Sequence, residues 1–461
     1  MFSPISTGAV SIDSYSPNTI ELRDTIRDGL AANGLMVSMA ISDLLVSAIA
    51  PIYIRARFLQ ERIQSGVVWN LLDSSFIADP YPTYRQLLER DPHHYSPLTG
   101  MITVAPYEDV DAILRDHRRF SSVIRGTEPF PLAEEQARRQ LSPSMQFQDP
   151  PDHTRLRGLV SRAFTPPQIA KMEGQIRTTA HSLLDQLGDS SEFDLMADFA
   201  NLLPMLVIAE MIGVPTDDRA QFKIWSDQII RGIEPNLSEA ELSALLDTAE
   251  ALAAYLAPII EDRRREPQDD LVSRLVLAEE EGNTLSNDET QITLRLLLVA
   301  GNETTTNLIG NGLKALLEHP EQLQLLRQQR ELIPQAIEEL LRYDSPVQID
   351  VRRLVEDTEI GDRQGKQGSL VTPLIGAANR DPQAFRDPDR LDITREDAGN
   401  ISFGRGIHHC LGAPLARLEA TVAFEVLVER FGEIHFGTRA PEYRSNIVLR
   451  GLDHLDVRVH A

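Results

Sequence analysis

Cys410 is the only cysteine among 461 residues, which excludes an intrachain disulfide. It lies in the segment Phe403-Gly404-Arg405-Gly406-Ile407-His408-His409-Cys410-Leu411-Gly412, just before a helix-forming run that begins at Ala413. Glycines allow a backbone to approach a flat ligand closely. A sulfur ahead of a helix N-terminus is stabilised as a thiolate by the helix dipole and by backbone N–H donors. A lone cysteine can also be a small buried hydrophobe, but this setting favours an ionised sulfur bound to a metal.

A second segment whose residue types could take part in catalysis lies in the middle of a long predicted helix. Its sequence is Ala300-Gly301-Asn302-Glu303-Thr304-Thr305-Thr306. Glycine, asparagine and three threonines are poor helix formers and weaken the local propensity by roughly 2 kcal/mol. Apolar residues on both sides indicate a buried helix, in which a threonine hydroxyl can bond to the carbonyl four residues earlier. We expect a widened groove beside Ala300 and Gly301, and the acid–alcohol pair Glu303 and Thr304 is suited to proton delivery.

The elements that position these segments are mostly helical. The longest amphipathic run covers 287–317 and begins with Ser286 and Glu289 at capping-box spacing. Other helices are predicted at 81–89, 152–163, 167–187, 196–212, 217–233 and 239–265, and strands at 101–105 and between Val347 and Ile375. This pattern predicts a mainly α fold with a small β region, and it is not a βαβ alternation.

Composition limits the function classes. The chain has 69 acidic against 45 basic residues, a formal net charge of -24, which repels nucleic acid and anionic membrane surfaces, so both are unfavourable partners for the domain as a whole. The absence of a disulfide framework fits a cytoplasmic location. We expect two parts, an N-terminal extension at 1–66 and a catalytic domain at 67–461. The weakly apolar stretch 35–54 raises the alternative of a membrane anchor, but Asp43 near its centre favours a helix packed on the domain surface.

Together the two segments resemble motifs of the cytochrome P450 family of haem-thiolate monooxygenases, and the match is closest to its soluble bacterial branch. The cysteine segment is similar to the family pattern Phe-Gly-x-Gly-x-His-x-Cys-x-Gly, and 300–304 to Ala-Gly-x-Glu-Thr. Glu339 and Arg342 resemble the family's Glu-x-x-Arg pair, and Arg390 resembles the third member of that ion-pair group. The resemblance covers about 67 to the C-terminus and implies the cytochrome P450-like fold, with the 287–317 helix over a haem.

The resemblance also implies residue roles. Cys410 would be the axial ligand of the iron of haem b, and Glu303 and Thr304 would relay protons and steady dioxygen. Cations for the two haem propionates would come from His153, Arg157, His408 and Arg352. Arg353 competes with Arg352 because strand alternation turns only one of them inward. Ala300, Gly301 and Phe403 are the remaining residues expected to contact the haem.

The substrate is expected to be a lipophilic small molecule, because the segments that would line the cavity are of mixed apolar character. These segments are 123–145, 225–235, 297–301, 347–351 and 446–448. No reductase domain is fused, so electrons would come from a separate ferredoxin-type donor and its reductase. Arg405, His409 and Arg417 lie near the outer side of the cysteine segment and are the expected docking cations.

Two alternatives remain at this point. A peroxide-driven haem-thiolate peroxygenase would need no redox partner, but such enzymes characteristically replace the acid–alcohol pair that this chain keeps. A non-catalytic homologue could act as a partner of another enzyme, but such relatives tend to lose the ligand cysteine. The retained Glu303, Thr304 and Cys410 therefore favour the monooxygenase.

Overall fold

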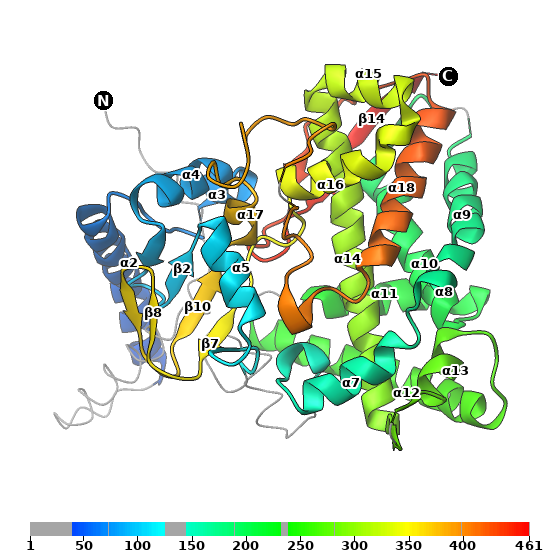
Figure 1. Ribbon diagram of the computed structural model, residues 1–461, viewed down its shortest axis with the longest axis horizontal. Coiled ribbons are helices and arrows are strands. Elements are labelled where there is room, and N and C mark those ends of the chain that lie inside the picture. Colours follow the sequence, from blue (N-terminus) through cyan, green and yellow to red (C-terminus); the bar gives the residue numbers. More distant parts are fainter. Residues whose placement is uncertain are drawn as a thin grey trace.

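The computed structural model describes residues 39–460, apart from 72, 125–143, 189, 232–237, 281 and 398. Figure 1 shows a large helical part built around one central helix, α14, and a smaller part in which short strands lie beside α2 to α5. The predicted mainly α architecture with a small β region is confirmed.

The helices differ widely in length, and the longest is α14. Their bounds are α2 Met39–Gln64, α3 Ser74–Ala78, α4 Tyr81–Arg90, α5 Tyr107–Arg115, α7 Asp152–Ser161, α8 Pro166–Lys171, α9 Glu173–Gln186, α10 Leu202–Ile212, α11 Arg219–Ile230, α12 Glu239–Arg265, α13 Leu271–Val276, α14 Asn287–Glu318, α15 Pro320–Gln328, α16 Ile333–Tyr343, α17 Ile375–Ala378 and α18 Ala413–Arg430.

The strands are all short. They are β1 His93–Tyr95, β2 Ile102–Val104, β3 Phe120–Ser121, β4 Glu192–Asp194, β5 Glu279–Glu280, β6 Asn283–Thr284, β7 Arg352–Leu354, β8 Thr358–Ile360, β9 Arg363–Gly365, β10 Leu370–Pro373, β11 Glu433–Phe436, β12 Glu442–Tyr443, β13 Leu452–His454 and β14 Asp456–His460. The largest described sheet has the order β1-β2-β10-β7-β3, with β10 parallel to β2 and antiparallel to β7.

The capping box predicted for α14 is present. The Ser286 side chain accepts from the Glu289 backbone N–H, and the Glu289 carboxylate accepts from the Ser286 N–H. Apolar side chains of α14 such as Leu294, Leu298 and Leu308 are buried in the main hydrophobic core, which also includes side chains of α10, α16 and α18. This burial explains how α14 stays helical through its weak central segment.

Two helical predictions need refinement. The run 167–187 is two helices, α8 and α9, which are separated at Met172. The run 196–212 begins with a π-helical turn at Met196–Ala200 and becomes regular only in α10. Hydrophobic periodicity identifies a helical run but does not detect a one-residue change in its winding.

The helix α2 covers most of the stretch 35–54 in which a membrane anchor was considered; 35–38 lie outside the described residues. Glu61 attaches α2 to the domain, because its buried carboxylate accepts from the Trp69 backbone N–H (2.9 Å) and from the Ser96 hydroxyl (2.7 Å). Within the described part of the chain, the helix segment with the length and apolar composition of a membrane span is Ala240–Arg265 of α12. The contacts of α12 with α11, α13 and α14 are typical of a helix in a globular core.

Candidate active site

The cysteine segment forms a short turn that leads directly into α18. A 3-10 turn covers Gly406–His408, and α18 begins at Ala413. Gly404 and Gly406 both have positive φ, and a Cβ at Gly406 would lie 2.6 Å from the Leu114 carbonyl oxygen. A side chain at position 406 would therefore clash with the end of α5, so glycine is required for the turn to pack there.

The sulfur of Cys410 is buried among groups that act on its pKa in opposite directions. Burial raises the pKa of the thiol, while hydrogen bonds from the backbone N–H groups of Gly412 and Ala413, together with the Arg157 cation, act to lower it. The net direction is upward, so the protein groups alone do not keep the sulfur ionised as the helix-dipole argument suggested. A bound metal cation would supply the missing positive charge.

Two imidazoles meet beside this turn. The rings of His153 on α7 and His408 lie 4.2 Å apart between centroids. His153 Nδ1 and His408 Nε2 are both buried, and neither has a hydrogen-bond partner in the part of the chain that the structure describes. Buried polar atoms in native proteins almost always have partners. These two nitrogens therefore fit hydrogen-bonding to a bound group.

Arg157 and Arg352 place positive charge beside the imidazoles of His153 and His408, with Asp149 and Asp350 as nearby carboxylates. Burial, then the neighbouring His153 and Arg352, lowers the pKa of His408 to about 4. Arg352 is buried and donates to Asp350 Oδ1 (2.6 Å) and to the Val351 carbonyl (2.8 Å). This cluster fits the pair of carboxylates carried by a haem.

Arg353, the competing candidate, points elsewhere and donates to the carbonyl of Val123 (2.9 Å). Arg157, the remaining predicted propionate cation, donates to the carbonyl of His409 (2.6 Å), one residue before the thiol. The structure therefore brings three predicted cations, His153, Arg157 and Arg352, to the cysteine turn.

The middle of α14 presents an open face. A Cβ built on Gly301 would meet nothing within 4 Å, and Ala300 beside it is exposed. The Thr304 hydroxyl donates to the Ala300 carbonyl (2.7 Å), which is the four-residue back-bond that the sequence predicted. These three residues lie on one face of the helix, so a flat ligand could approach the backbone there.

Glu303 lies next to Thr304 in sequence but has a charged partner of its own. Its buried carboxylate accepts from Arg444 Nη1 (2.5 Å), and Arg444 Nη2 donates to Asn201 Oδ1 (3.3 Å). The pairing holds the Glu303 carboxylate against Arg444, largely away from water. Sequence reasoning missed Arg444, which follows a short strand far along the chain and carries no motif.

Behind the cysteine turn, a buried ion-pair group holds the loops together. Arg342 donates to both carboxylate oxygens of Glu339 (2.7 and 2.8 Å), as predicted. The third member, however, is Arg395, whose Nε lies 3.1 Å from Glu339 Oε2. The prediction of Arg390 is wrong, because that side chain is exposed and only its backbone carbonyl accepts from Arg342 and Arg395.

The predicted docking cations on the outer side are largely neutralised. Arg405 Nε donates to Asp111 (3.1 Å) and Arg417 Nε to Glu338 (2.5 Å). Burial, then Arg405, lowers the pKa of His409, so this imidazole is neutral at pH 7. The side chain of Arg417 also lies over the Phe403 ring, 4.4 Å from its centroid, which orients Phe403 beside the turn.

A cavity of about 470 Å³ lies between α7 and the first turns of α14. Val123 and Met145, the two ends of one predicted lining segment, contribute to it, and Leu156 and Ile292 add apolar surface; the intervening 125–143 lie outside the described residues. An ion pair between Arg155 and Glu289 joins its two helical walls. Of the other predicted lining segments, 347–351 and 446–448 lie side by side, since Gln348 N–H donates to the Val448 carbonyl (2.9 Å).

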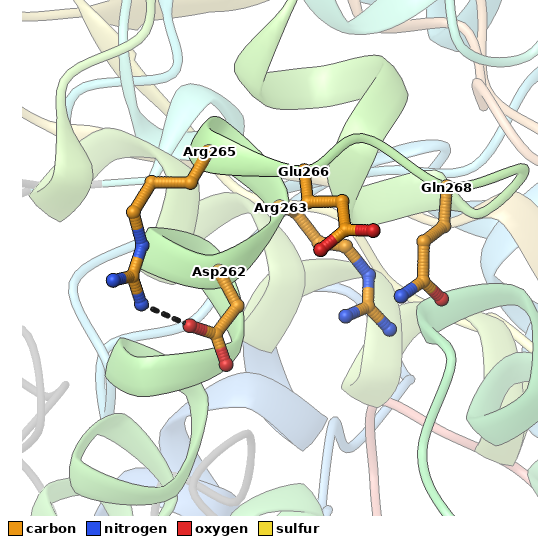
Figure 2. A pocket seen from close by; sticks show the side chains of 5 residues that line it. All are labelled: Asp262, Arg263, Arg265, Glu266 and Gln268. Carbon is orange, nitrogen blue, oxygen red and sulfur yellow. Dashed lines mark hydrogen bonds and ion pairs between the residues drawn. The ribbon is translucent and has the colours of Figure 1, made fainter.

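A second hollow, of about 640 Å³, lies at the C-terminal end of α12, where Arg265 forms an ion pair with Asp262 (Figure 2). Its five lining side chains are all charged or polar, and none belongs to the motifs described above. This hollow therefore has no part in the candidate active site.

A family model and curated relatives match most of this chain. A family model described as Cytochrome P450 matches residues 92–449. The chain is 41% identical over 399 residues to the polyketide biosynthesis cytochrome P450 PksS of Bacillus subtilis, covering 83% of this chain and 96% of that protein. It is 39% identical over 402 residues to 6-deoxyerythronolide B hydroxylase of Saccharopolyspora erythraea, covering 85% and 98%.

Solved structures give the same result. The structure of PksS matches with a TM-score of 0.78 at 38% identity and covers 86% of this chain and 100% of that one. A structure of P450BioI in complex with an acyl carrier protein that carries hexadec-9Z-enoic acid matches with a TM-score of 0.77 at 38% identity, covering 84% and 99%.

Proposed function

This chain belongs to the cytochrome P450 family, and from that premise we propose that it inserts one oxygen atom of O2 into a lipophilic small molecule, with electrons from a separate ferredoxin and its reductase. Its class is that of the P450 monooxygenases, which are oxidoreductases. The observation that carries the proposal is the convergence of the Cys410 sulfur with two buried imidazole nitrogens that have no partner in the described residues.

Within this proposal, the Cys410 sulfur would hold the iron of a haem b. When bound, the haem supplies the activation of O2, which a thiolate ligand favours by pushing electron density onto the iron. His153, His408, Arg352 and Arg157 would bind its propionates, and Phe403, held by Arg417, would pack against it. The open backbone at Ala300 and Gly301 leaves room for the other face of the ring and for the substrate.

Glu303 and Thr304 divide the proton handling. The Thr304 hydroxyl, already bonded to the Ala300 carbonyl, lies on the open face of α14 and can accept a further hydrogen bond or pass on a proton. The Glu303 carboxylate, held by Arg444, is a proton acceptor that a side-chain rotation could bring toward that face. Together the two side chains would deliver protons to the open face of α14 beside Thr304.

The substrate class rests on the cavity and on the relatives. The cavity between α7 and α14 mixes apolar side chains with a few polar ones, which is typical of sites for lipophilic molecules. The relatives are named for polyketide biosynthesis, for hydroxylation of 6-deoxyerythronolide B and, in the P450BioI complex, for hexadec-9Z-enoic acid on an acyl carrier protein. A medium-sized lipophilic substrate fits all of these.

The electron donor is proposed to dock over the cysteine turn. Because Arg405 and Arg417 are already paired, we add the end of α5 and its following turn, which pack against Gly406. Arg118 is exposed there and extends the positive surface, whereas the exposed Arg115 shares Asp111 with Arg405 as an ion-pair partner. An acidic ferredoxin would be attracted to this surface despite the overall charge of the chain.

We place catalysis in residues 67–461 and in the cytoplasm, with 1–66 as an extension of separate role. Reconstitution tests the function. Product should form with ferredoxin, reductase and NADPH, and a screen of lipophilic compounds should find ligands that shift the haem absorption spectrum. Equal turnover with hydrogen peroxide alone would instead favour the peroxygenase.

A further inference from the structure

Helix α2 has two different faces. Its inner face carries Phe58 and Glu61, and the Glu61 carboxylate is bonded to Trp69 and Ser96 of the domain. Its outer face carries Ile52, Leu59 and Ile63, which are 68%, 58% and 75% exposed. These positions are spaced i, i+7 and i+11, so they form one stripe along the helix.

The stripe is unusual for this molecule. Eight large apolar side chains are strongly exposed in the described part of the chain, and three of them belong to this one helix face. Scattered single apolar residues are normal on a protein surface, but an aligned group on a rigid helix marks an interaction site. The helix lies at the outer edge of the molecule in Figure 1 and precedes the residues, 92–449, that match the family model.

Cations accompany the stripe. Arg55 and Arg62 are both exposed and, seven residues apart, lie along the same flank of the outer face. No described carboxylate pairs with either of them, in a chain whose formal net charge is -24. Apolar side chains flanked by arginines are complementary to the surface of an anionic bilayer, where the apolar face enters the acyl boundary and the guanidinium groups meet lipid phosphates.

We propose that the outer face of α2 binds the surface of an anionic lipid membrane, with the helix lying in the plane of the interface and not crossing it. Glu61 fixes the catalytic domain to the helix, so membrane contact would also set the orientation of the domain. An enzyme held at the membrane surface in this way is close to lipophilic molecules that partition into the bilayer. The proposal does not depend on which molecule is oxidised.

Sedimentation of the full-length holoenzyme with vesicles tests the proposal. Vesicles of phosphatidylcholine alone are compared with vesicles that contain phosphatidylglycerol, at low and at high salt. We expect the wild-type chain to sediment with the anionic vesicles and salt to weaken its binding. The double variant Leu59→Glu/Ile63→Glu should bind at least about tenfold more weakly, because two apolar contacts are replaced by charges that the surface repels.

A matched control is Leu277→Glu, since Leu277 is 60% exposed after α13 and lies outside the stripe. It should bind like the wild type, and the carbon monoxide difference spectrum of each variant reports that the fold is intact. Arg55→Gln/Arg62→Gln should lose the preference for anionic over neutral vesicles. A wild-type chain that stays in the supernatant with both vesicles would overturn the proposal, and so would unchanged binding of the Leu59/Ile63 variant. Self-association through this face in place of lipid binding would overturn it too.

Discussion

Glu419 on α18 is a buried carboxyl group whose ionisation the fold opposes. The residue is 2% exposed, its Oε2 has no hydrogen-bond partner among the described residues, and the Thr305 hydroxyl of α14 is its polar neighbour. Burial raises the pKa of Glu419 from 4.5 to about 8. In the folded protein at pH 7 the group is therefore mostly protonated, whereas in the unfolded chain it is ionised.

This difference links stability to pH. Below the unfolded pKa of 4.5, Glu419 is protonated in both the folded and the unfolded state, so it does not change the free energy of unfolding. As the pH rises toward about 8, the unfolded state gains stability by about 1.4 kcal/mol per pH unit, which amounts to about 3 kcal/mol at pH 7. In Glu419→Gln the side chain cannot ionise, so the free energy of unfolding should not fall with pH for this reason. Relative to the wild type, the variant should become more stable as the pH rises from 5 to 8.

Thermal unfolding followed by haem absorbance measures the effect. Unfolding entropies of about 2 cal/mol/K per residue give roughly 1 °C per kcal/mol for a chain of 461 residues. The difference in Tm between variant and wild type should thus grow by about 3 °C from pH 5 to pH 7. The control Glu425→Gln, on the same helix, removes a carboxylate that is paired with Arg177 at 2.5 Å and should show no such gain. A Tm difference for Glu419→Gln that does not change with pH would refute the reasoning.

Three further predictions concern the candidate active site and its support. Arg395→Ala should destabilise the holoenzyme by about 1.5–3 kcal/mol, because the buried Glu339 carboxylate loses one charged donor but keeps Arg342, whereas Arg390→Ala should leave its Tm nearly unchanged. Glu303→Gln should lower turnover by about 10²-fold or more, as loss of a proton-transfer group does, while the carbon monoxide spectrum stays that of a thiolate; unchanged turnover would exclude the proton role. Arg352→Ala should weaken haem retention during gel filtration, whereas Arg353→Ala should retain haem, since its guanidinium binds a backbone carbonyl; equal haem loss would contradict the assignment of Arg352.

The long helix and the glycine turn at Cys410 could be predicted because each depends on local sequence. A capping box and a run of apolar residues define α14, and positive-φ glycines define the turn. The back-bond from Thr304 to Ala300 is likewise a contact within one helical turn. Local rules of this kind transfer directly from the sequence to the structure.

Partners that come from distant loops could not be predicted in this way. Arg395, and not Arg390, reaches Glu339, because the intervening loop folds so that the side chain of Arg390 remains outside. Arg444 reaches Glu303 from a position 141 residues away. Such contacts depend on how loops pack, and a lone arginine in a loop gives no signal of its partner. The burial that raises the pKa of the Cys410 thiol is also a property of the packed fold.

The most direct test of the central assignment is the carbon monoxide difference spectrum of the reduced protein, recorded for the wild type and for Cys410→Ser at equal haem content. We expect a thiolate-type spectrum from the wild type. The serine variant should lose that spectrum, together with monooxygenase turnover, even if haem still binds through His153, His408 and Arg352. A thiolate-type spectrum from Cys410→Ser would contradict the assignment of Cys410 as the axial ligand.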